Sequence, residues 1–246
     1  MKGEETIDEL RKHGLRIIQP RHGYRFSLDP LLLCDFAAIR GGEEGIDLGA
    51  GCGVIPLILA RSATGTRLTG VECQEAMAEL AGRNVELNGL SDRVVIRHAD
   101  VLQVKDLFQP SSFDLVVANP PYRKRGSGRI SPKQGRDTAR HESTAEIADF
   151  LAAAKYLVKP TGRICFIFHP SRVTEFLTNA AGLKLAVTGL RMVHGSSASE
   201  ARMFLVEMVK GRKADTRILP PLFVYDADGE YSEEMDGIFG EVESSG

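Results

Sequence analysis

The sequence predicts an α/β fold in which helices cover both faces of one mostly parallel sheet. Two observations support this prediction. Apolar runs of strand length alternate with segments of helical spacing from residue 45 to residue 210, which is the pattern of repeated strand–helix units. Residues 47–53, at the end of the first run, read DLGAGCG, so three glycines stand where the first helix should open. In sheets of this kind, ligands bind beyond the carboxyl ends of the strands.

The expected elements follow from the apolar pattern of each segment. Strands are predicted over residues 45–49, 67–72, 94–100, 113–119, 163–170, 184–194 and 201–210. Helices are predicted over residues 53–63, 74–89, 147–162 and 172–183. Gly89 is expected to cap the second helix, because glycine readily adopts the left-handed conformation that ends many helices. We expect one domain over 1–246, with an N-terminal segment (1–44), a core (45–210) and a tail (211–246).

The composition excludes several classes of protein. Of the 246 residues, 43% are hydrophobic and 26% are charged, as in globular proteins with a core of their own. The formal net charge of -2 argues against a protein that coats nucleic acid non-specifically, but it allows a local basic patch. No apolar run approaches a membrane span, and residues 1–14 lack the apolar centre of a signal peptide, so we expect a cytoplasmic protein. The cysteines form no CxxC pair, and no metal site is expected.

The glycine-rich turn points to a ligand. Gly49, Gly51 and Gly53 carry no side chain, so the backbone can turn sharply and approach a ligand closely. Their spacing is GxGxG, whereas dinucleotide-binding enzymes have GxGxxG, and no lysine follows as it would in a P-loop. Asp47 ends the preceding strand, where its carboxylate can accept hydrogen bonds from an amine or, through water, from an ammonium group.

Two further strands also end in acidic residues. Glu72 ends the second strand, about 20 residues beyond the glycines, where an acidic side chain typically binds both hydroxyls of a ribose. Asp100 ends the third strand, where it can meet the amino group of an adenine. Each residue alone could instead be a helix N-cap. As a set they favour an adenosine compound without a polyphosphate, and S-adenosyl-L-methionine fits; the predicted cofactor site also includes Cys73 and Val101.

Residues 119–122, NPPY, follow the fourth strand with groups suited to an exocyclic amine. Such an amine is a poor nucleophile, and it needs acceptors for both N–H bonds rather than a strong base. Asn119 offers a side-chain carbonyl and Pro120 a backbone carbonyl, and the prolines orient both before the substrate arrives. Asn119 also borders the cofactor site, and Tyr122 offers a ring on which a base can stack. The alternative is a tight turn without a catalytic role.

A basic loop follows NPPY directly. It begins with Arg123, Lys124 and Arg125 and continues through Arg129, Lys133, Arg136 and Arg140. A cationic loop beside a base pocket is what a phosphate backbone requires, so these cations, with Pro121 and Tyr122, are interpreted as binding the substrate. The alternative is a solvated surface loop. A target base in structured RNA would have to be splayed out, which costs least in an exposed loop.

The order DLGAGCG, VE, HAD, NPPY resembles the class I S-adenosylmethionine-dependent methyltransferases over residues 45–210. The resemblance implies a Rossmann-like sheet of seven strands in which the last strand, 201–210, runs antiparallel between its neighbours. NPPY is similar to the motif of the amino-methyltransferases, which act on exocyclic base nitrogens or on glutamine side chains. A base in ribosomal RNA and a protein glutamine therefore stay open as acceptors. Complete motifs disfavour a non-catalytic scaffold, and the GxGxG spacing disfavours a nicotinamide oxidoreductase.

The flanking segments resemble the family of bacterial tRNA1(Val) (adenine-N6)-methyltransferases. The features are residues 17–37, a basic loop that ends in ARHE, and the tail ILPPLFVYDADGEYSEEM. The resemblance implies tRNA as the partner, no membrane, and methylation of the adenine 3′ of the anticodon. It also implies that residues 17–37 close over the methionine end of the cofactor through Tyr24 and Asp29, with Arg25 and Ser27 as further candidates. The structural alternative for this segment is an N-terminal strand followed by a capped helix, which is compatible with that role. A monomer and a weak dimer both stay open.

Overall fold

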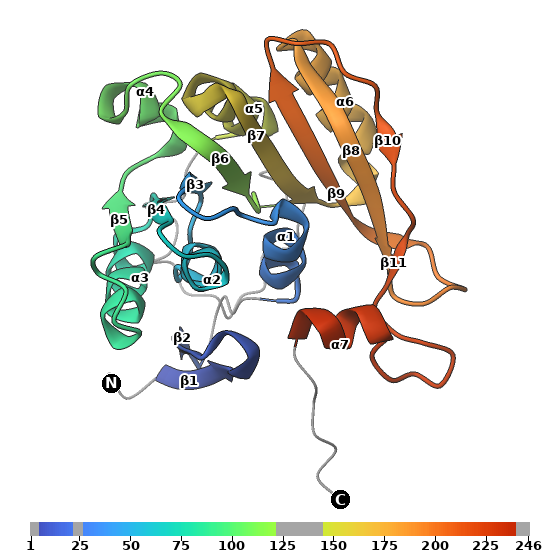
Figure 1. Cartoon of the computed structure of the whole chain (residues 1–246), viewed down its shortest axis with the longest axis horizontal. Coiled ribbons are helices and arrows are strands. Elements are labelled where there is room, and N and C mark those ends of the chain that lie inside the picture. The colour runs from blue at the N-terminus through green and yellow to red at the C-terminus, as the bar shows by residue number, and fades with distance from the viewer. Residues whose placement is uncertain (1–4, 22–26, 122–144, 240–246) are drawn as a thin grey trace, which may run out of the picture.

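The computed structural model describes residues 5–21, 27–121 and 145–239. Long strands form most of its central sheet, and in chain order they are β3 (Glu44–Leu48), β4 (Arg67–Glu72), β5 (Val94–His98), β6 (Phe113–Ala118), β7 (Val158–Phe168), β8 (Leu185–His194) and β9 (Ala201–Lys210). Their order across the sheet is β8-β9-β7-β6-β3-β4-β5 (Figure 1). Pairing is parallel except at β9, which runs antiparallel to both β7 and β8. The predicted sheet with one antiparallel strand is confirmed.

Two short strands from the tail extend the sheet beyond the predicted seven strands. β10 (Arg217–Ile218) and β11 (Leu222–Phe223) both pair in parallel with β8, so the sheet has nine strands within the described residues. The N–H of Leu219 donates to the carbonyl of Leu190 (2.8 Å), and the N–H of Val224 donates to that of His194 (2.9 Å). A strand of two residues has no alternation of apolar and polar positions, so the sequence pattern could not indicate it.

Helices cover both faces of the sheet, as predicted. One face carries α1 (Asp29–Ala37), α2 (Val54–Ser62) and α3 (Glu75–Leu87), and the other carries α5 (Ile147–Leu157) and α6 (Val173–Gly182). The side chains of successive β6 residues pack alternately on the two faces of the sheet. Leu115 and Val117 belong to the hydrophobic cluster of the first three helices, whereas Val116 and Ala118 belong to that of α5 and α6. Burial on both faces explains why β6 is a continuous apolar run.

The helix predicted over 147–162 is five residues too long. α5 ends at Leu157, and β7 begins at Val158. Pro160 explains the early end, because proline lacks an N–H to continue a helix and disfavours the helical conformation of the residue before it. Apart from this boundary, the predicted strands and helices begin and end within two residues of the observed ones.

Gly89 ends α3 as predicted. It has φ +61°, and its N–H donates to the carbonyl of Glu86 (3.0 Å), while the N–H of Leu90 donates to that of Val85 (3.1 Å). This pair of bonds is the Schellman arrangement, which satisfies carbonyls that the helix leaves without a partner. A left-handed residue is needed there, and glycine adopts that conformation without steric cost.

Within residues 17–37 a strand and a helix are present, as in the structural alternative, but the sequence did not indicate the other elements at the two ends of the chain. The N-terminal hairpin consists of β1 (Glu5–Leu10), η1 (Arg11–His13) and β2 (Leu15–Pro20), and Glu5 forms a bidentate ion pair with Arg83 of α3 (2.7 and 2.8 Å). The tail ends in α7 (Glu233–Phe239), where Glu234 forms a bidentate ion pair with Arg191 of β8 (2.6 and 2.7 Å). Lys12 also donates to the carbonyl of Gly237. Over the described part of the chain, no helix is long and apolar enough to cross a membrane.

Candidate functional site

The strand ends singled out in the sequence lie along one edge of the sheet, which we call the carboxyl edge. β3 lies between β4 and β6, where Asp47 is opposite Gly70 on one side and Val117 on the other. Glu72, the last residue of β4, is opposite His98 of β5. Because these strands are parallel, the segments that follow all of them emerge at this edge. The register therefore brings the predicted cofactor residues to one place.

The glycine-rich turn is held against the adjacent strand. The N–H groups of Gly49 and Ala50 both donate to the carbonyl of Val71 on β4 (2.9 Å each). Gly49 and Gly53 have φ angles of +88° and +84°, in the left-handed region that other residues rarely adopt. A Cβ on Gly53 would also lie 3.1 Å from the Cβ of Ala81 on α3. Glycine is needed at residue 53 both for the conformation and for the close approach of α3.

Glu72 holds the glycine-rich turn from β4. Its side chain is 6% exposed, and its two carboxylate oxygens accept from the N–H groups of Gly51 (2.9 Å) and Gln74 (2.8 Å). The Cys73 thiol lies 3.6 Å from the oxygen that Gln74 contacts. A carboxylate accepts up to about four hydrogen bonds, so Glu72 can hold the turn and still accept a ligand hydroxyl.

Asp47 is the buried carboxylate that the fold leaves unsatisfied. Its side chain is 0% exposed, and among the described residues neither of its carboxylate oxygens has a hydrogen-bond partner. Burial, together with the nearby charge of Glu72, raises the pKa of Asp47 well above its ordinary value of 3.8. An unpaired buried carboxylate is unfavourable, so a cationic or hydrogen-bond-donating ligand would stabilise it. Asp47 is therefore not a helix N-cap, because its carboxylate accepts no backbone N–H among the described residues.

Asp100 does form an N-cap. Its Oδ1 accepts from the N–H of Leu102 (2.9 Å), and its own N–H donates to Oε1 of Gln103 (3.3 Å), which makes a capping box at η2 (Val101–Gln103) before α4 (Val104–Leu107). Val101 is 5% exposed and belongs to the hydrophobic cluster beneath α5. Because a carboxylate can cap a helix and accept a further bond, contact between Asp100 and an adenine stays a prediction.

Asn119 follows the last residue of β6. Its side chain is half-buried, Pro120 is buried and Pro121 is exposed. Asn119 lies two residues beyond Val117, just as Gly49 lies two residues beyond Asp47, and Val117 and Asp47 are paired. The register therefore places the predicted acceptor carbonyls beside the glycine-rich turn.

Asp29 begins α1 and is half-buried, and its N–H lies 3.4 Å from the Ser27 hydroxyl. Its contact with the cofactor stays a prediction. Several other predicted residues lie outside the described residues: Tyr24, Arg25, Tyr122, Arg123, Lys124, Arg125, Arg129, Lys133, Arg136 and Arg140. Their roles also stay predictions.

Sequence reasoning misses Asn84 of α3. Its buried side chain accepts from the N–H of Ile18 on β2 (2.7 Å) and donates to the carbonyls of Ile18 (3.0 Å) and Cys52 (2.9 Å). Asn84 thereby joins the N-terminal hairpin to the glycine-rich turn. The available signal was an amide on the apolar stripe of the helix, between Ala81 and Val85, where only a side chain with buried partners is expected.

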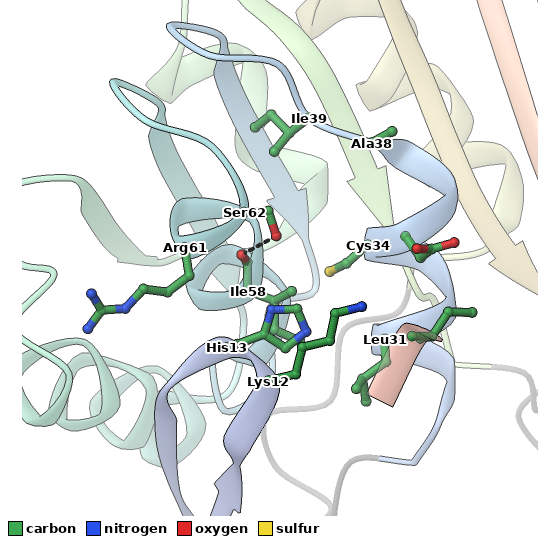
Figure 2. Close-up of a pocket in the computed structure, with 11 residues that line it drawn as sticks. Lys12, His13, Leu31, Cys34, Ala38, Ile39, Ile58, Arg61 and Ser62 are labelled. Carbon is green, nitrogen blue, oxygen red and sulfur yellow. Dashed lines mark hydrogen bonds between the residues drawn. The ribbon is translucent and has the colours of Figure 1, made fainter. Parts of the chain in front are cut away.

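A cavity of about 510 Å³ lies away from these residues, between η1, α1, α2 and α7. In Figure 2, Lys12 and His13 of η1 line one side of it, and Cys34 of α1 lines the opposite side. Burial raises the pKa of the Cys34 thiol well above its ordinary value, so the thiol stays protonated. None of the described lining residues is predicted to bind the cofactor or the substrate. The cavity therefore adds no residue to the predicted site at the carboxyl edge.

Comparisons with known proteins find relatives over most of the chain. The model of the methyltransferase small domain matches residues 30–181. A tRNA1(Val) (adenine(37)-N6)-methyltransferase of Porphyromonas gingivalis is 33% identical and aligns with 78% of this chain and 76% of its own. A protein with the same name from Aeromonas hydrophila is 28% identical, over 87% of each chain. The crystal structure of a predicted O-methyltransferase from Agrobacterium tumefaciens has a TM-score of 0.71 at 23% identity, over 85% of this chain and 94% of that chain.

Proposed function

The chain belongs to the methyltransferase small domain family, and we propose that it transfers a methyl group from S-adenosyl-L-methionine to the N6 amine of an adenine in tRNA. It is an S-adenosylmethionine-dependent methyltransferase. The names of its relatives point to adenine 37 of tRNA1(Val), the base 3′ of the anticodon. A tRNA substrate and four free cysteines favour the cytoplasm as the place of the reaction.

One observation carries the cofactor part of the proposal. Asp47 is fully buried without a hydrogen-bond partner among the described residues, and Glu72 lies close enough to raise its pKa further. Two carboxylates at neighbouring strand ends favour a ligand that brings positive charge and hydrogen-bond donors. S-adenosyl-L-methionine has an ammonium group, a sulfonium and a ribose with two hydroxyls. The residues present therefore fit this cofactor.

The residues assigned to the cofactor have separate roles in the proposal. Asp47 compensates its positive charge, and Glu72 accepts from the ribose hydroxyls while it keeps the N–H of Gly51 in place. Asp100 accepts from the adenine amino group. Gly49 and Gly53 allow the backbone of the turn to approach the ligand, since neither has a side chain.

The chain contributes acceptors and orientation to the chemical step. The bound cofactor supplies an electrophilic methyl group. Asn119 accepts one N–H of the target amine through Oδ1, and the carbonyl of Pro120 accepts the other. These two bonds turn the nitrogen lone pair toward the methyl group, and no strong base is needed. Pro120 is buried, so its carbonyl can act where water does not compete for the hydrogen bond.

The acceptor is tested by following a labelled methyl group. Purified full-length protein and methyl-labelled S-adenosyl-L-methionine are incubated separately with unmodified tRNA, ribosomal RNA and a cell protein extract. The RNA is then digested to nucleosides. We expect label in N6-methyladenosine from tRNA only. Label in ribosomal RNA or in protein glutamine would overturn the proposed acceptor.

The position is tested with two transcripts of tRNA1(Val). One has adenine at position 37, and the matched control has guanine there. Methyl transfer to the first transcript alone is the expected result. Equal transfer to both transcripts would place the target at another adenine.

A further inference from the structure

A strongly basic cavity lies at the sheet edge opposite the carboxyl edge. Its volume is about 980 Å³, and four of its described lining residues are the cations Lys155, Lys184, Arg212 and Lys213. One lining residue, Asp215, is acidic. Lys155 belongs to the last turn of α5, Lys184 follows α6, and the other two follow β9. Three segments that are distant in the sequence therefore gather positive charge in one place.

The fold does not neutralise these cations. Among the described residues, no carboxylate lies within ion-pair distance of any of the four. Lys210, the last residue of β9, lies beside them, and its Nζ donates to the Ser111 hydroxyl (2.9 Å) and to the carbonyl of Lys155 (3.1 Å). Burial and the charge of Lys155 lower the pKa of Lys210, as expected where positive charges accumulate without compensation.

Lys184 occupies a position that would suit glycine. Its φ is +57°, in the left-handed region, and its N–H donates to the carbonyl of Ala181 at the end of α6 (2.9 Å). A residue with a Cβ is strained in this conformation. The chain thus has a strained cation in the lining of a basic cavity, at a position where glycine would adopt the backbone conformation more easily.

The cavity is too far from the carboxyl edge to contact the same nucleotide. β8 begins at Leu185, which lines the cavity, and ends at His194, level with Phe223 of β11 at the other edge. Nine residue steps of about 3.3 Å separate these two ends by roughly 30 Å. Figure 1 shows the start of β8 and the arrowhead of β9 together at the top of the sheet, and β8 ends far below them. An RNA that reaches both places must be longer than a small hairpin loop.

We propose that the basic cavity binds the phosphate backbone of the RNA substrate, at the sheet edge opposite the one where the base is methylated. The proposal rests on the proposed function, and it adds a second contact on the substrate. Four cations without ion-pair partners match the charge of successive phosphates, and each cation that neutralises a phosphate releases counterions. Contacts of this kind position an RNA without reading its sequence.

The decisive variant replaces Lys184, Arg212 and Lys213 together by Gln. The matched control replaces Arg11, Arg40 and Arg67 by Gln, because these cations are also exposed, lie elsewhere and give the same change in net charge. Binding is measured with full-length tRNA and with the isolated anticodon stem-loop over a range of KCl concentrations. Methyl transfer by the unchanged protein is measured with the same RNA preparations.

For full-length tRNA, we expect the Kd of the cavity variant to rise at least tenfold at about 0.15 M salt. The slope of log K against log salt should fall by roughly two to three units. The KM for tRNA should rise while kcat stays unchanged, because no group at the carboxyl edge is altered. Stem-loop binding should change by less than about twofold, since the stem-loop cannot span the distance between the two edges. The control variant should match the unchanged protein.

Three outcomes would overturn the inference. Equal binding of full-length tRNA by the cavity and control variants, with methyl transfer intact in the unchanged protein, would remove this inference alone. Inorganic tripolyphosphate that saturates the cavity without displacing tRNA would assign the cavity to a small anion. No methyl transfer to tRNA by the unchanged protein would remove the proposed function, and this inference with it.

Discussion

Two buried ionisable side chains in the same sheet differ in whether the fold supplies hydrogen-bond partners for them. Arg163 of β7 is 8% exposed, and it donates to both carboxylate oxygens of Glu43 (2.7 and 3.0 Å) and to the carbonyls of Ala37 and Ala38. Burial acts to lower the pKa of Arg163, but the hydrogen bond to Glu43 and the negative charges nearby together outweigh it, and the pKa is raised. Asp47 of β3 is more deeply buried, and it has no hydrogen-bond partner among the described residues.

The two residues lie near each other, so depth in the sheet does not explain the difference. Arg163 and Gly45 both pair with Leu115 of β6, and Asp47 is only two residues beyond Gly45. Arg163 connects the end of α1 to the sheet, because its guanidinium donates to the carbonyls of Ala37 and Ala38 and to the Glu43 carboxylate. Asp47 lies at the edge where we propose that the cofactor binds. A buried charge that the fold compensates supports the structure, and one that the fold leaves uncompensated indicates a ligand.

The largest expected effect comes from Arg163→Met. The change removes the guanidinium from two carbonyls and from the Glu43 carboxylate, which keeps the N–H of Arg40 as a donor. The free energy of unfolding should therefore fall by about 3–5 kcal/mol. Urea unfolding followed by circular dichroism measures it. Glu43→Gln should cost less, because it leaves a neutral acceptor for the guanidinium. A loss below about 1 kcal/mol for Arg163→Met would show that the fold does not depend on this compensation.

Asn119→Ala tests a polar group at the carboxyl edge. We expect turnover of tRNA to fall about 10²-fold, as on loss of one transition-state hydrogen bond. The Kd for S-adenosyl-L-methionine and the midpoint of thermal unfolding should stay nearly unchanged, because the proposal assigns this carbonyl to the substrate. Single-turnover kinetics and calorimetric titration separate the two quantities. Unchanged turnover would refute the role of Asn119, and a large loss of stability would make it a structural residue.

Asp47→Asn removes the uncompensated charge and keeps the shape of the side chain. The Kd for S-adenosyl-L-methionine should rise about tenfold or more, because a hydrogen bond to a charged group is lost. The free protein should become more stable at neutral pH. The raised pKa of Asp47 means that the folded state keeps a proton that the unfolded state releases, so the free energy of unfolding falls as pH rises above 3.8 toward the raised pKa.

Thermal unfolding of both proteins at a series of pH values provides the measurement. The stability of the unchanged protein relative to Asp47→Asn should decrease as pH rises through this window. Addition of S-adenosyl-L-methionine should reverse the order of the two proteins, since only the carboxylate compensates the positive charge of the ligand. A variant that is less stable than the unchanged protein at neutral pH, without ligand, would mean that Asp47 has a partner within the protein.

The sequence predicted the core strands and helices and the strand ends that meet at the carboxyl edge, but it did not predict contacts between distant segments. DLGAGCG and Glu72 are close in the chain, and the parallel sheet brings them together without further information. Asp100 shows the limit, because the sequence cannot distinguish a helix cap from a ligand contact, and the structure shows that the cap is formed. The basic cavity depends on segments that are distant in the chain, so no local pattern could indicate it. For Asn84, the apolar stripe of α3 indicates a buried amide but not its partners on β2 and in the glycine-rich turn.

The smallest expected effect comes from Lys184, an exposed cation that the fold also leaves uncompensated. Lys184→Gly relieves the left-handed strain, worth about 1 kcal/mol, but increases the freedom of the unfolded chain, so the net gain in stability should be about 0.5 kcal/mol or less. Lys184→Ala keeps the strain and should gain nothing. Both variants lose the same charge, so both should bind full-length tRNA equally weakly. If glycine alone restored tRNA binding, the conformation of residue 184 would matter for binding and its charge would not. An uncompensated charge would then indicate a ligand only where it is buried, as at Asp47.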